Sequence, residues 1–266
     1  MRARRPSRFC LLLLLVASAT AQTGTPSPTT APPPPPVEGE DSDPTRPVVW
    51  SVREEFYKLR GDDWANVLIV RKDKAFLKNQ PRWGGKRGIL TRFDLPMTVA
   101  SRAGVTQGGL GDLYLQVLYV PYLTRKLAFV GGTGILLPTA TDRFLGTGKL
   151  VVAPAVAGVW FIPKRGFFLL KFQDYVSVAG DTARPDLHYL TTTPLLVWRF
   201  KRKWWTQLDG ETKTHFEADG RTGYKAGVLL GRMFNGKTGA SVKVEVPFGG
   251  YREGDVTIKL SLIRVK

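Results

Sequence analysis

The protein has 266 residues, and its 39 Lys and Arg outnumber its 22 Asp and Glu, which gives a formal net charge of +17. A single cysteine excludes a framework of intramolecular disulfides. Strong positive charge is typical of proteins that meet nucleic acid, anionic lipid or acidic ligands.

Residues 1–21 have the layout of a secretory signal peptide. Four arginines precede an apolar run at 11–16, and Ala-Thr-Ala at 19–21 forms a cleavage site. This run is too short for a membrane anchor, which needs roughly 20 apolar residues. Cleavage removes Cys10, and the loss of four Arg and no acid lowers the charge from +17 to +13. Export argues against nucleic acid as a partner and favours membrane lipid.

Residues 22–47 are rich in Pro, Thr and Ser, with five consecutive prolines at 32–36. Such a segment cannot bury a core and favours extended polyproline II, so we predict a disordered tether. A Pro-rich ligand motif is the alternative.

Residues 48–266 alternate between apolar-rich runs of roughly 10–14 residues and short polar breaks. At 240–246 and 256–262, apolar and polar residues alternate strictly, which indicates strands with one apolar and one polar face. Further strands are predicted at 87–97, 110–122, 127–138, 149–161, 167–179, 187–200, 204–214 and 222–234, with a weaker pair at 49–59 and 64–71. No window has helical periodicity.

Strands of this length suit a tilted crossing of a bilayer, which takes roughly 9–11 residues, better than a globular sheet. The sequence therefore predicts an all-β fold, an antiparallel up-and-down transmembrane β-barrel of 10–12 strands at 48–266. A soluble β-sandwich or lipocalin-like barrel is the alternative. Because proline lacks a ladder donor, Pro154 and Pro194 predict local bulges.

The breaks between strands alternate in length and in charge. Short breaks are basic, whereas longer ones carry most of the loop acids, and successive turns of such a barrel lie on opposite rims. We predict a periplasmic rim at anionic phospholipid headgroups, although basic turns could serve solubility alone. Its members are Arg125, Lys126, Lys164, Arg165, Lys201, Arg202, Lys203 and Lys237. The outer-loop candidates, which could meet an entering solute, are Asp142, Arg143, Asp181 and Asp186.

Polar residues on the face opposite the apolar one are candidates for the lumen. They are Arg92, Asp94, Asp112, Tyr114, Gln116, Lys171, Gln173, Asp209, Glu211, Lys213, Lys225, Lys243, Glu245 and Lys259. Charges of both signs could fill a small barrel or line a wet channel, and the sequence does not decide between them. The slight excess of basic residues would favour anionic solutes.

Catalysis has little support in the sequence. The two histidines, His188 and His215, lie near strand ends, and neither Ser177 nor Ser241 has an evident histidine partner. Metal-ligand spacing and a phosphate-binding loop are absent from the sequence, so we predict no enzyme, no metal and no cofactor.

Four segments, in order, resemble the MetA-pathway-of-phenol-degradation family of outer-membrane barrels. They are GGLGDLYLQVLYVP (108–121), ILLPTATDRFLGTGKLVVAPA (135–155), VSVAGDTARPDLHYLTTTPLLVW (176–198) and VLLGRMF (228–234). The resemblance implies an outer-membrane barrel of a Gram-negative-type bacterium that passes small or hydrophobic compounds. Barrel-assembly machinery would be a partner, although the chain ends LSLIRVK, without the terminal aromatic residue common in such barrels.

Two functions follow from these observations. The first is a passive channel or transporter whose lumen charges set selectivity. The alternative is a non-conducting barrel that binds or adheres through its outer loops, including a surface loop expected at 139–148.

Overall fold

The computed structural model describes residues 48–265, apart from 80–84, 201–202, 250 and 253. Three predictions therefore lie outside the described residues: the signal peptide at 1–21, the tether at 22–47, and the rim residues Lys201 and Arg202.

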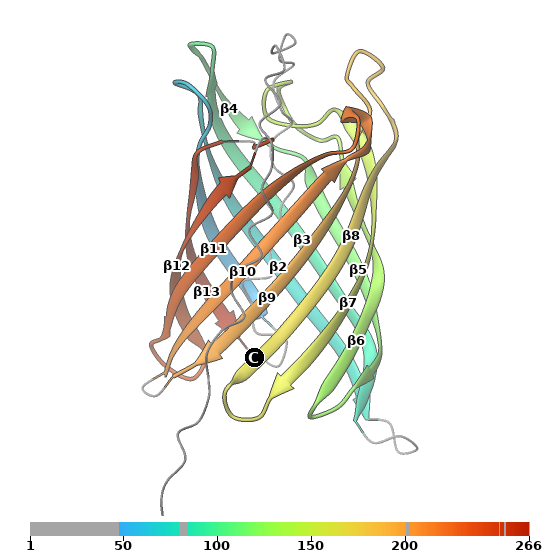
Figure 1. Ribbon diagram of the computed structural model, residues 1–266, viewed down its shortest axis with the longest axis vertical. Coiled ribbons are helices and arrows are strands. Elements are labelled where there is room, and N and C mark those ends of the chain that lie inside the picture. The colour runs from blue at the N-terminus through green and yellow to red at the C-terminus, as the bar shows by residue number, and fades with distance from the viewer. Residues whose placement is uncertain (1–47, 80–84, 201–202, 250, 253, 266) are drawn as a thin grey trace, which may run out of the picture. The chain divides into compact units, whose positions relative to one another are not determined.

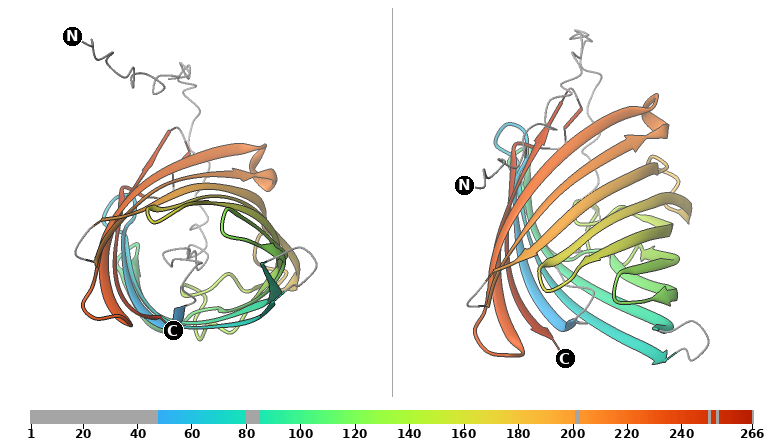
Figure 2. Two further views of the ribbon diagram at one scale, coloured as in Figure 1. Left: turned by 90° about the horizontal axis from the view of Figure 1, so that it is seen from below. Right: turned by 60° about the horizontal axis from the view of Figure 1, so that its bottom comes forward.

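One antiparallel sheet closes on itself as a β-barrel (Figures 1 and 2). Twelve strand positions make up the ring, because β4 pairs with the end of β3 while β5 pairs with the remainder of β3. The strands are β1 (Val48–Lys58), β2 (Trp64–Asn79), β3 (Lys86–Arg102), β4 (Val105–Leu110), β5 (Leu113–Leu123), β6 (Leu127–Leu137), β7 (Lys149–Ile162), β8 (Gly166–Gly180), β9 (His188–Arg199), β10 (Trp204–His215), β11 (Arg221–Met233), β12 (Thr238–Phe248) and β13 (Val256–Val265). A 3-10 turn, η2 (Phe216–Ala218), follows β10.

The prediction of an all-β, up-and-down barrel is confirmed, and the two weaker strands make the total twelve. The sequence prediction ended two strands too early, since β2 continues to Asn79 and β3 to Arg102. It also missed β4, which turns back on β3 through Ala103 and Gly104, both at positive φ (49° and 79°). Within the described residues, no helix has the length and apolarity needed to span a membrane.

The bulges predicted at Pro154 and Pro194 are wrong. No register shift occurs at either residue. Both rings face outward, and at Pro194 the ladder with β10 loses only the two pairs between Asp209↔Leu195 and Thr212↔Thr192. A register shift does lie between Tyr119 and Tyr122, beside Pro121, and others lie where there is no proline, as between Leu150 and Val151.

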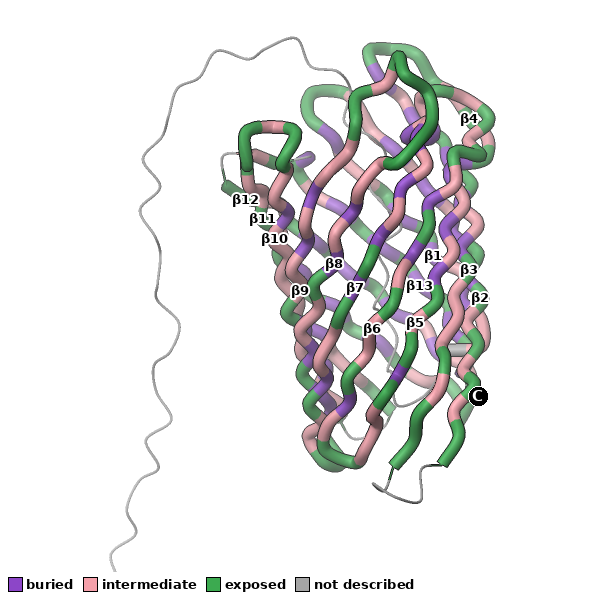
Figure 3. The backbone as a smooth tube through the Cα atoms, turned by 90° about the vertical axis from the view of Figure 1, so that its right-hand side faces the viewer, coloured by how far each residue is buried: buried purple, intermediate pink, exposed green. Residues whose placement is uncertain are grey.

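The polarity of the wall is opposite to that of a soluble protein. Along β13, Thr257, Lys259 and Ser261 are buried inside the barrel, whereas Ile258, Leu260 and Leu262 are 39–49% exposed. Buried and exposed residues alternate in this way along the strands (Figure 3). An apolar exterior around a polar interior is the pattern of a barrel surrounded by hydrocarbon, and in water it would expose a continuous apolar surface.

The longest loops lie at one end of the barrel (Figure 1). The opposite, short-turn end carries residues 124–126, 163–165, 200–203 and 234–237, together with the first residue of β1 and the last of β13. The long-loop end carries residues 138–148, 181–187, 216–220 and 249–255, and also the shorter connections 59–63, 103–104 and 111–112.

Candidate functional site

The inner wall of the barrel is divided by side-chain chemistry. The charged half comprises β10–β13 and β1–β3, which carry most of the ionisable side chains that face the interior. The apolar half comprises β6–β9, whose inner side chains are mostly Ala, Val, Leu, Phe and Tyr. Strand β5 lies between the two halves.

Glu245 on β12 is the centre of the ion pairs in the charged half. It is 1% exposed, and its oxygens lie 2.7 Å from Lys243 Nζ, 3.0 Å from Lys259 Nζ and 3.6 Å from Lys225 Nζ. Lys243 also lies 3.1 Å from Asp209 Oδ2 on β10. Three strands are therefore connected by one carboxylate, and each of these three lysines has a counter-charge.

The charge pairs continue into β1, β2 and β3. Arg71 and Asp94, which are directly opposite in the β2–β3 ladder, form two parallel hydrogen bonds of 2.6 Å. One step along, Arg92 pairs with Asp73 at 3.0 Å. Opposite charges on directly opposed residues stabilise a sheet, and a two-bond arginine–carboxylate pair also fixes orientation.

The structure places the lumen candidates on the inner face of the barrel and brings most of them together. Lys171, Gln173, Asp209, Glu211, Lys213, Lys225, Lys243, Glu245 and Lys259 extend across β8 and β10–β13, and Arg92 and Asp94 lie on β3. Sequence reasoning missed Arg53, Glu55 and Arg71, which are all at most 3% exposed. Their alternation with outward Val52 and Val70 was the available signal, but the two strands were only weakly predicted.

The apolar half is filled by large side chains lying against small ones. Near the short-turn end, Phe167 is fully buried and packs with Leu195 and Val197. Further along the barrel, Tyr114 lies over Gly134, and its hydroxyl accepts a hydrogen bond of 2.9 Å from Gln173 on β8. A Cβ on Gly134 would lie 2.2 Å from that hydroxyl oxygen, so glycine is required for this arrangement.

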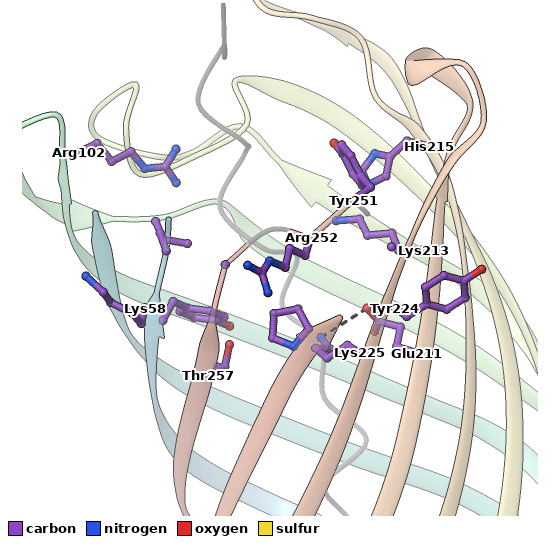
Figure 4. Close-up of a pocket in the computed structure, with 15 residues that line it drawn as sticks. Lys58, Arg102, Glu211, Lys213, His215, Tyr224, Lys225, Tyr251, Arg252 and Thr257 are labelled. Atoms are coloured by element: carbon purple, nitrogen blue, oxygen red, sulfur yellow. Dashed lines mark ion pairs between the residues drawn. The ribbon is translucent and has the colours of Figure 1, made fainter. Parts of the chain in front are cut away.

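Two cavities lie inside the barrel. The mid-barrel cavity, of about 30 Å³, lies between the two halves: Lys225, Lys243, Lys259, Asp209, Glu211 and Glu245 border it from the charged half, and Lys171, Thr191, Thr193 and Leu195 border it from β8 and β9. The outer cavity, of about 70 Å³, lies toward the long-loop end (Figure 4). Lys225 and Glu211, paired at 3.4 Å, border both cavities and therefore separate them.

Basic residues dominate the outer cavity. Lys58, Arg102, Lys213, Lys225 and Arg252 line it, whereas Glu211 is its one acid among the described residues. Figure 4 shows these side chains arriving from separate strands and from loop 249–255, with His215 and Tyr251 at one side. The two rings lie 5.0 Å apart, and Lys213 lies 4.3 Å from the centre of the Tyr189 ring. Convergent cations in a partly buried cavity favour an anion.

Asp112, predicted to lie in the lumen, instead holds loop 138–148. Its carboxylate accepts hydrogen bonds from the backbone N–H of Thr147 (2.5 Å), the hydroxyl of Thr147 (2.7 Å) and the backbone N–H of Ala140 (3.2 Å). The surface loop predicted at 139–148 is wrong for its second half. Leu145 is 1% exposed and packs against Ala65 on the inner wall, so the loop bends inward over the barrel.

The outer-loop candidates contact neighbouring residues of the loops and strand ends rather than one another. Asp142 accepts a hydrogen bond from the backbone N–H of Phe144 (2.8 Å), and the carbonyl oxygen of Arg143 accepts one from Arg184 (2.5 Å). Asp181 lies 4.0 Å from the same arginine. Asp186 pairs with Lys149 at 2.8 Å, and this hydrogen bond together with the lysine charge lowers the pKa of the carboxyl. These contacts connect loops 138–148 and 181–187.

The rim candidates that the structure describes lie in exposed turns at the short-turn end. They are Arg125, Lys126, Lys164, Arg165, Lys203 and Lys237. The guanidinium of Arg165 lies 5.9 Å from the centre of the Trp198 ring, which is the pairing of cation and aromatic ring expected at a membrane interface.

The histidines and serines do not converge on one reaction centre. His188 lies 3.4 Å from Asp174, and His215 packs between the rings of Tyr189 and Tyr251. Ser177 donates to Asp186 at 3.3 Å. Among residues 48–265 as described, no group of three or more His, Cys, Asp or Glu side chains is arranged to hold a metal ion.

Comparison with known proteins reveals a shared fold at low sequence identity. No protein-family model matches the chain, and no curated protein matches it. An outer membrane channel from Pseudomonas putida F1 is 11% identical, with a TM-score of 0.68 over 86% of this chain and 100% of that one. The NanC porin is 9% identical (TM-score 0.55, 81% and 98% covered) and the KdgM porin 10% identical (TM-score 0.51, 80% and 98% covered). The chain therefore has a barrel fold similar to those of outer-membrane channels and porins, while the resemblance to the MetA-pathway family stays a prediction.

Proposed function

We propose that the protein is a passive channel for small solutes, with a preference for anions, in the outer membrane of a Gram-negative-type bacterium. The observation that carries this proposal is the closed barrel with an apolar exterior and a charged interior that holds cavities. The fold similarity to an outer membrane channel and to two porins supports it.

The lining of the cavities is the reason to propose anions. Together the two cavities are bordered by eight basic residues, Lys58, Arg102, Lys171, Lys213, Lys225, Lys243, Arg252 and Lys259, and by three acids, Asp209, Glu211 and Glu245. The acids gather at mid-barrel, whereas the described lining of the outer cavity has five cations and one acid. An entering anion would therefore meet the strongest positive potential first, which raises its local concentration. The MetA-pathway resemblance suggests small or hydrophobic compounds, and the lining narrows this to small anionic ones.

The size of the cavities argues for a narrow channel. A water molecule needs a cavity of roughly 10–15 Å³, so cavities of about 30 and 70 Å³ hold only a few waters. Passage of anything larger requires movement of the Lys225–Glu211 pair that separates them. We expect small conductance steps rather than those of a wide porin.

The orientation follows from the charge of the rims. The basic short-turn end would face the periplasm, where each cation near anionic headgroups gains about 1 kcal/mol. The outer cavity and the long loops would then face the exterior, and assembly machinery would insert the barrel from the periplasmic side.

A second candidate is a non-conducting barrel that binds a partner through its outer loops. The observation in its favour is the inward loop 138–148, which Asp112 and Leu145 hold against the inner wall. Such a barrel would float with membranes but would carry no current.

Planar-bilayer recording tests the channel. The wild-type protein should give discrete steps and a reversal potential that shows anion preference in a KCl gradient. Lys213→Gln combined with Arg252→Gln should reduce that preference by about two- to fivefold, since two of the five outer cations are neutralised. Lys164→Gln combined with Arg165→Gln removes the same charge outside the lumen and should leave selectivity unchanged. A wild-type barrel that inserts into the bilayer but gives no conductance steps would overturn the proposal. So would an equal change of selectivity in both double variants.

A further inference from the structure

A groove runs along the outer wall of the barrel beside the seam where the first and last strands join. It has a volume of about 680 Å³ and crosses β1, β13, β12 and β11. Its lining is mainly apolar, with Val52, Leu230, Val242, Leu260 and Leu262 all facing outward. The small side chain of Ala240 lies among them.

A second, basic cavity lies next to this groove at the short-turn end. Its volume is about 350 Å³, and the described residues that line it are Val49, Trp50, Lys237, Arg264 and Val265, with no acid among them. Trp50 is directly opposite Arg264 in the β1–β13 ladder. A backbone hydrogen bond of 2.8 Å from Val265 to the carbonyl of Lys237 holds the β11–β12 turn beside the end of β13.

Outward residues of the basic cavity and of the groove follow one another along β1 and β13. On the outward face, Val52 follows Trp50 on β1, and Leu262 precedes Arg264 on β13. An apolar groove therefore ends at two cations and a tryptophan, on the rim where the outward face gives way to turns. The polarity along this path is that of one amphiphilic molecule, apolar along its length and anionic at its end.

We propose that this surface binds a phospholipid with an anionic headgroup. The phosphate and its neighbours would lie in the basic cavity between Lys237 and Arg264, with Trp50 at the headgroup level. The acyl chains would follow the groove past Leu262 and Leu260. Membrane proteins place cations and tryptophan at the membrane interface, where these side chains contact lipid headgroups. Basic pockets beside an apolar wall bind anionic lipids.

The position of this site gives the lipid a structural role. The β1–β13 ladder closes the barrel, and its register shifts between Val48 and Trp50, at the headgroup end of the site. A lipid in contact with β1, β13 and the β11–β12 turn would connect the two sides of this irregular junction. We expect bound lipid to stabilise the closed barrel.

The far end of the groove limits how the acyl chains lie. Glu54 is the groove's acid among the described residues, and it accepts a hydrogen bond of 3.0 Å from Asn66. At the opposite side, the guanidinium of Arg232 lies 5.3 Å from the centre of the Trp204 ring. The apolar path between them follows β12 and β13.

This inference depends on the proposed membrane location but not on conduction. Purified barrel would be placed in vesicles of phosphatidylcholine containing a minor fraction of phosphatidylglycerol, and its co-purifying lipid would be counted by native mass spectrometry. We expect phosphatidylglycerol to be enriched over phosphatidylcholine and to raise the melting temperature, whereas inorganic phosphate should not raise it.

Three variants separate the site from general charge attraction. Lys237→Gln combined with Arg264→Gln should weaken phosphatidylglycerol binding by about 25-fold, at roughly fivefold for each cation. Ala240→Phe keeps both cations but fills the groove, so it should also release the lipid. Lys164→Gln combined with Arg165→Gln, on the same rim but outside the groove, should retain it.

Specific results would overturn the proposal. Barrel that floats with vesicles but shows no enrichment of phosphatidylglycerol has no such site. Equal losses in the two double variants would mean that the whole rim attracts anionic lipid without a site. A dimer seen by mass spectrometry and abolished by Ala240→Phe would mean that a second copy of the chain occupies the groove. Failure to float would instead contradict the membrane location itself.

Discussion

The two halves of the inner wall fill the same barrel by different means. In the charged half, long side chains reach across strands and meet counter-charges, as Lys243 of β12 meets Asp209 of β10 at 3.1 Å. In the apolar half, rings lie against small residues, as Tyr114 lies over Gly134. An ion pair couples a residue to one or a few specific partners, whereas apolar packing distributes the interaction over many neighbours.

This difference determines how each half should respond to mutation and to solutes. Removing one member of a buried ion pair leaves a charge that neither water nor protein compensates fully. Removing a buried ring leaves a cavity, whose cost depends on how far its neighbours relax. The charged half can exchange an internal carboxylate for a solute anion, while the apolar half offers a passing anion few partners, chiefly Lys171 on β8. We therefore expect stability to depend on both halves but selectivity to depend on the charged half.

The largest effect should come from Glu245→Gln. The substitution preserves size but removes the carboxylate charge shared by Lys225, Lys243 and Lys259. We expect a loss of about 3–5 kcal/mol in the free energy of unfolding, measured by denaturant titration of the detergent-folded barrel.

Glu217→Gln is the matched control for this variant. Glu217 is exposed in η2, so the same chemical change there should alter stability by no more than about 0.5 kcal/mol. If Glu245→Gln lowered the free energy of unfolding no more than its control does, water would be solvating the lysine charges. The charged half would then be a wet channel rather than a network of coupled ion pairs.

Sequence periodicity predicted the barrel because a bilayer outside and a polar lumen inside impose a period of two on each strand. It also identified inner residues such as Lys243 and Lys259. It could not predict which of them would meet, because the pairing of Lys243 with Asp209 depends on strand tilt and on the absence of a side chain at Gly227 between them. Strand lengths were underestimated where the polarity pattern changes, as at Thr98 and Ala100, which are buried near the loops.

Loop 138–148 shows a different limit of the sequence. Its residues are polar and glycine-rich, which predicts a surface loop, and nothing local indicates that it bends inward. The contact that bends it joins Thr147 to Asp112, 35 positions away in the chain. Both segments belong to the motifs that resemble one family, and in the structure they are hydrogen-bonded to each other.

Phe167→Ala tests the apolar half and should have the second largest effect. Phe167 is fully buried, and its loss should lower the free energy of unfolding by about 3 kcal/mol, the lower end for such a change, because water from the lumen can enter the space. Selectivity in bilayers should not change. Phe168→Ala, on the same strand but 37% exposed on the outer face, is the control and should cost less. A change in anion preference for Phe167→Ala would contradict the division of roles between the halves.

The smallest changes in unfolding free energy are expected from two glycine-to-alanine substitutions, one in each half. A Cβ on Gly134 would lie 2.2–2.6 Å from the hydroxyl and ring carbons of Tyr114, and a ring packed on a wall cannot move aside without disturbing its hydrogen bond to Gln173. A Cβ on Gly227 would lie 2.7 Å from a carboxylate oxygen of Asp209, the end of a side chain that can rotate away. We expect Gly134→Ala to cost about 1–3 kcal/mol and Gly227→Ala about 1 kcal/mol or less, by the same denaturant titration. The order matters more than the values, because it reports which half is rigid. The reverse order would mean that the ion pairs over Gly227 are fixed in one geometry, and the charged half could not then open for a solute by moving its side chains.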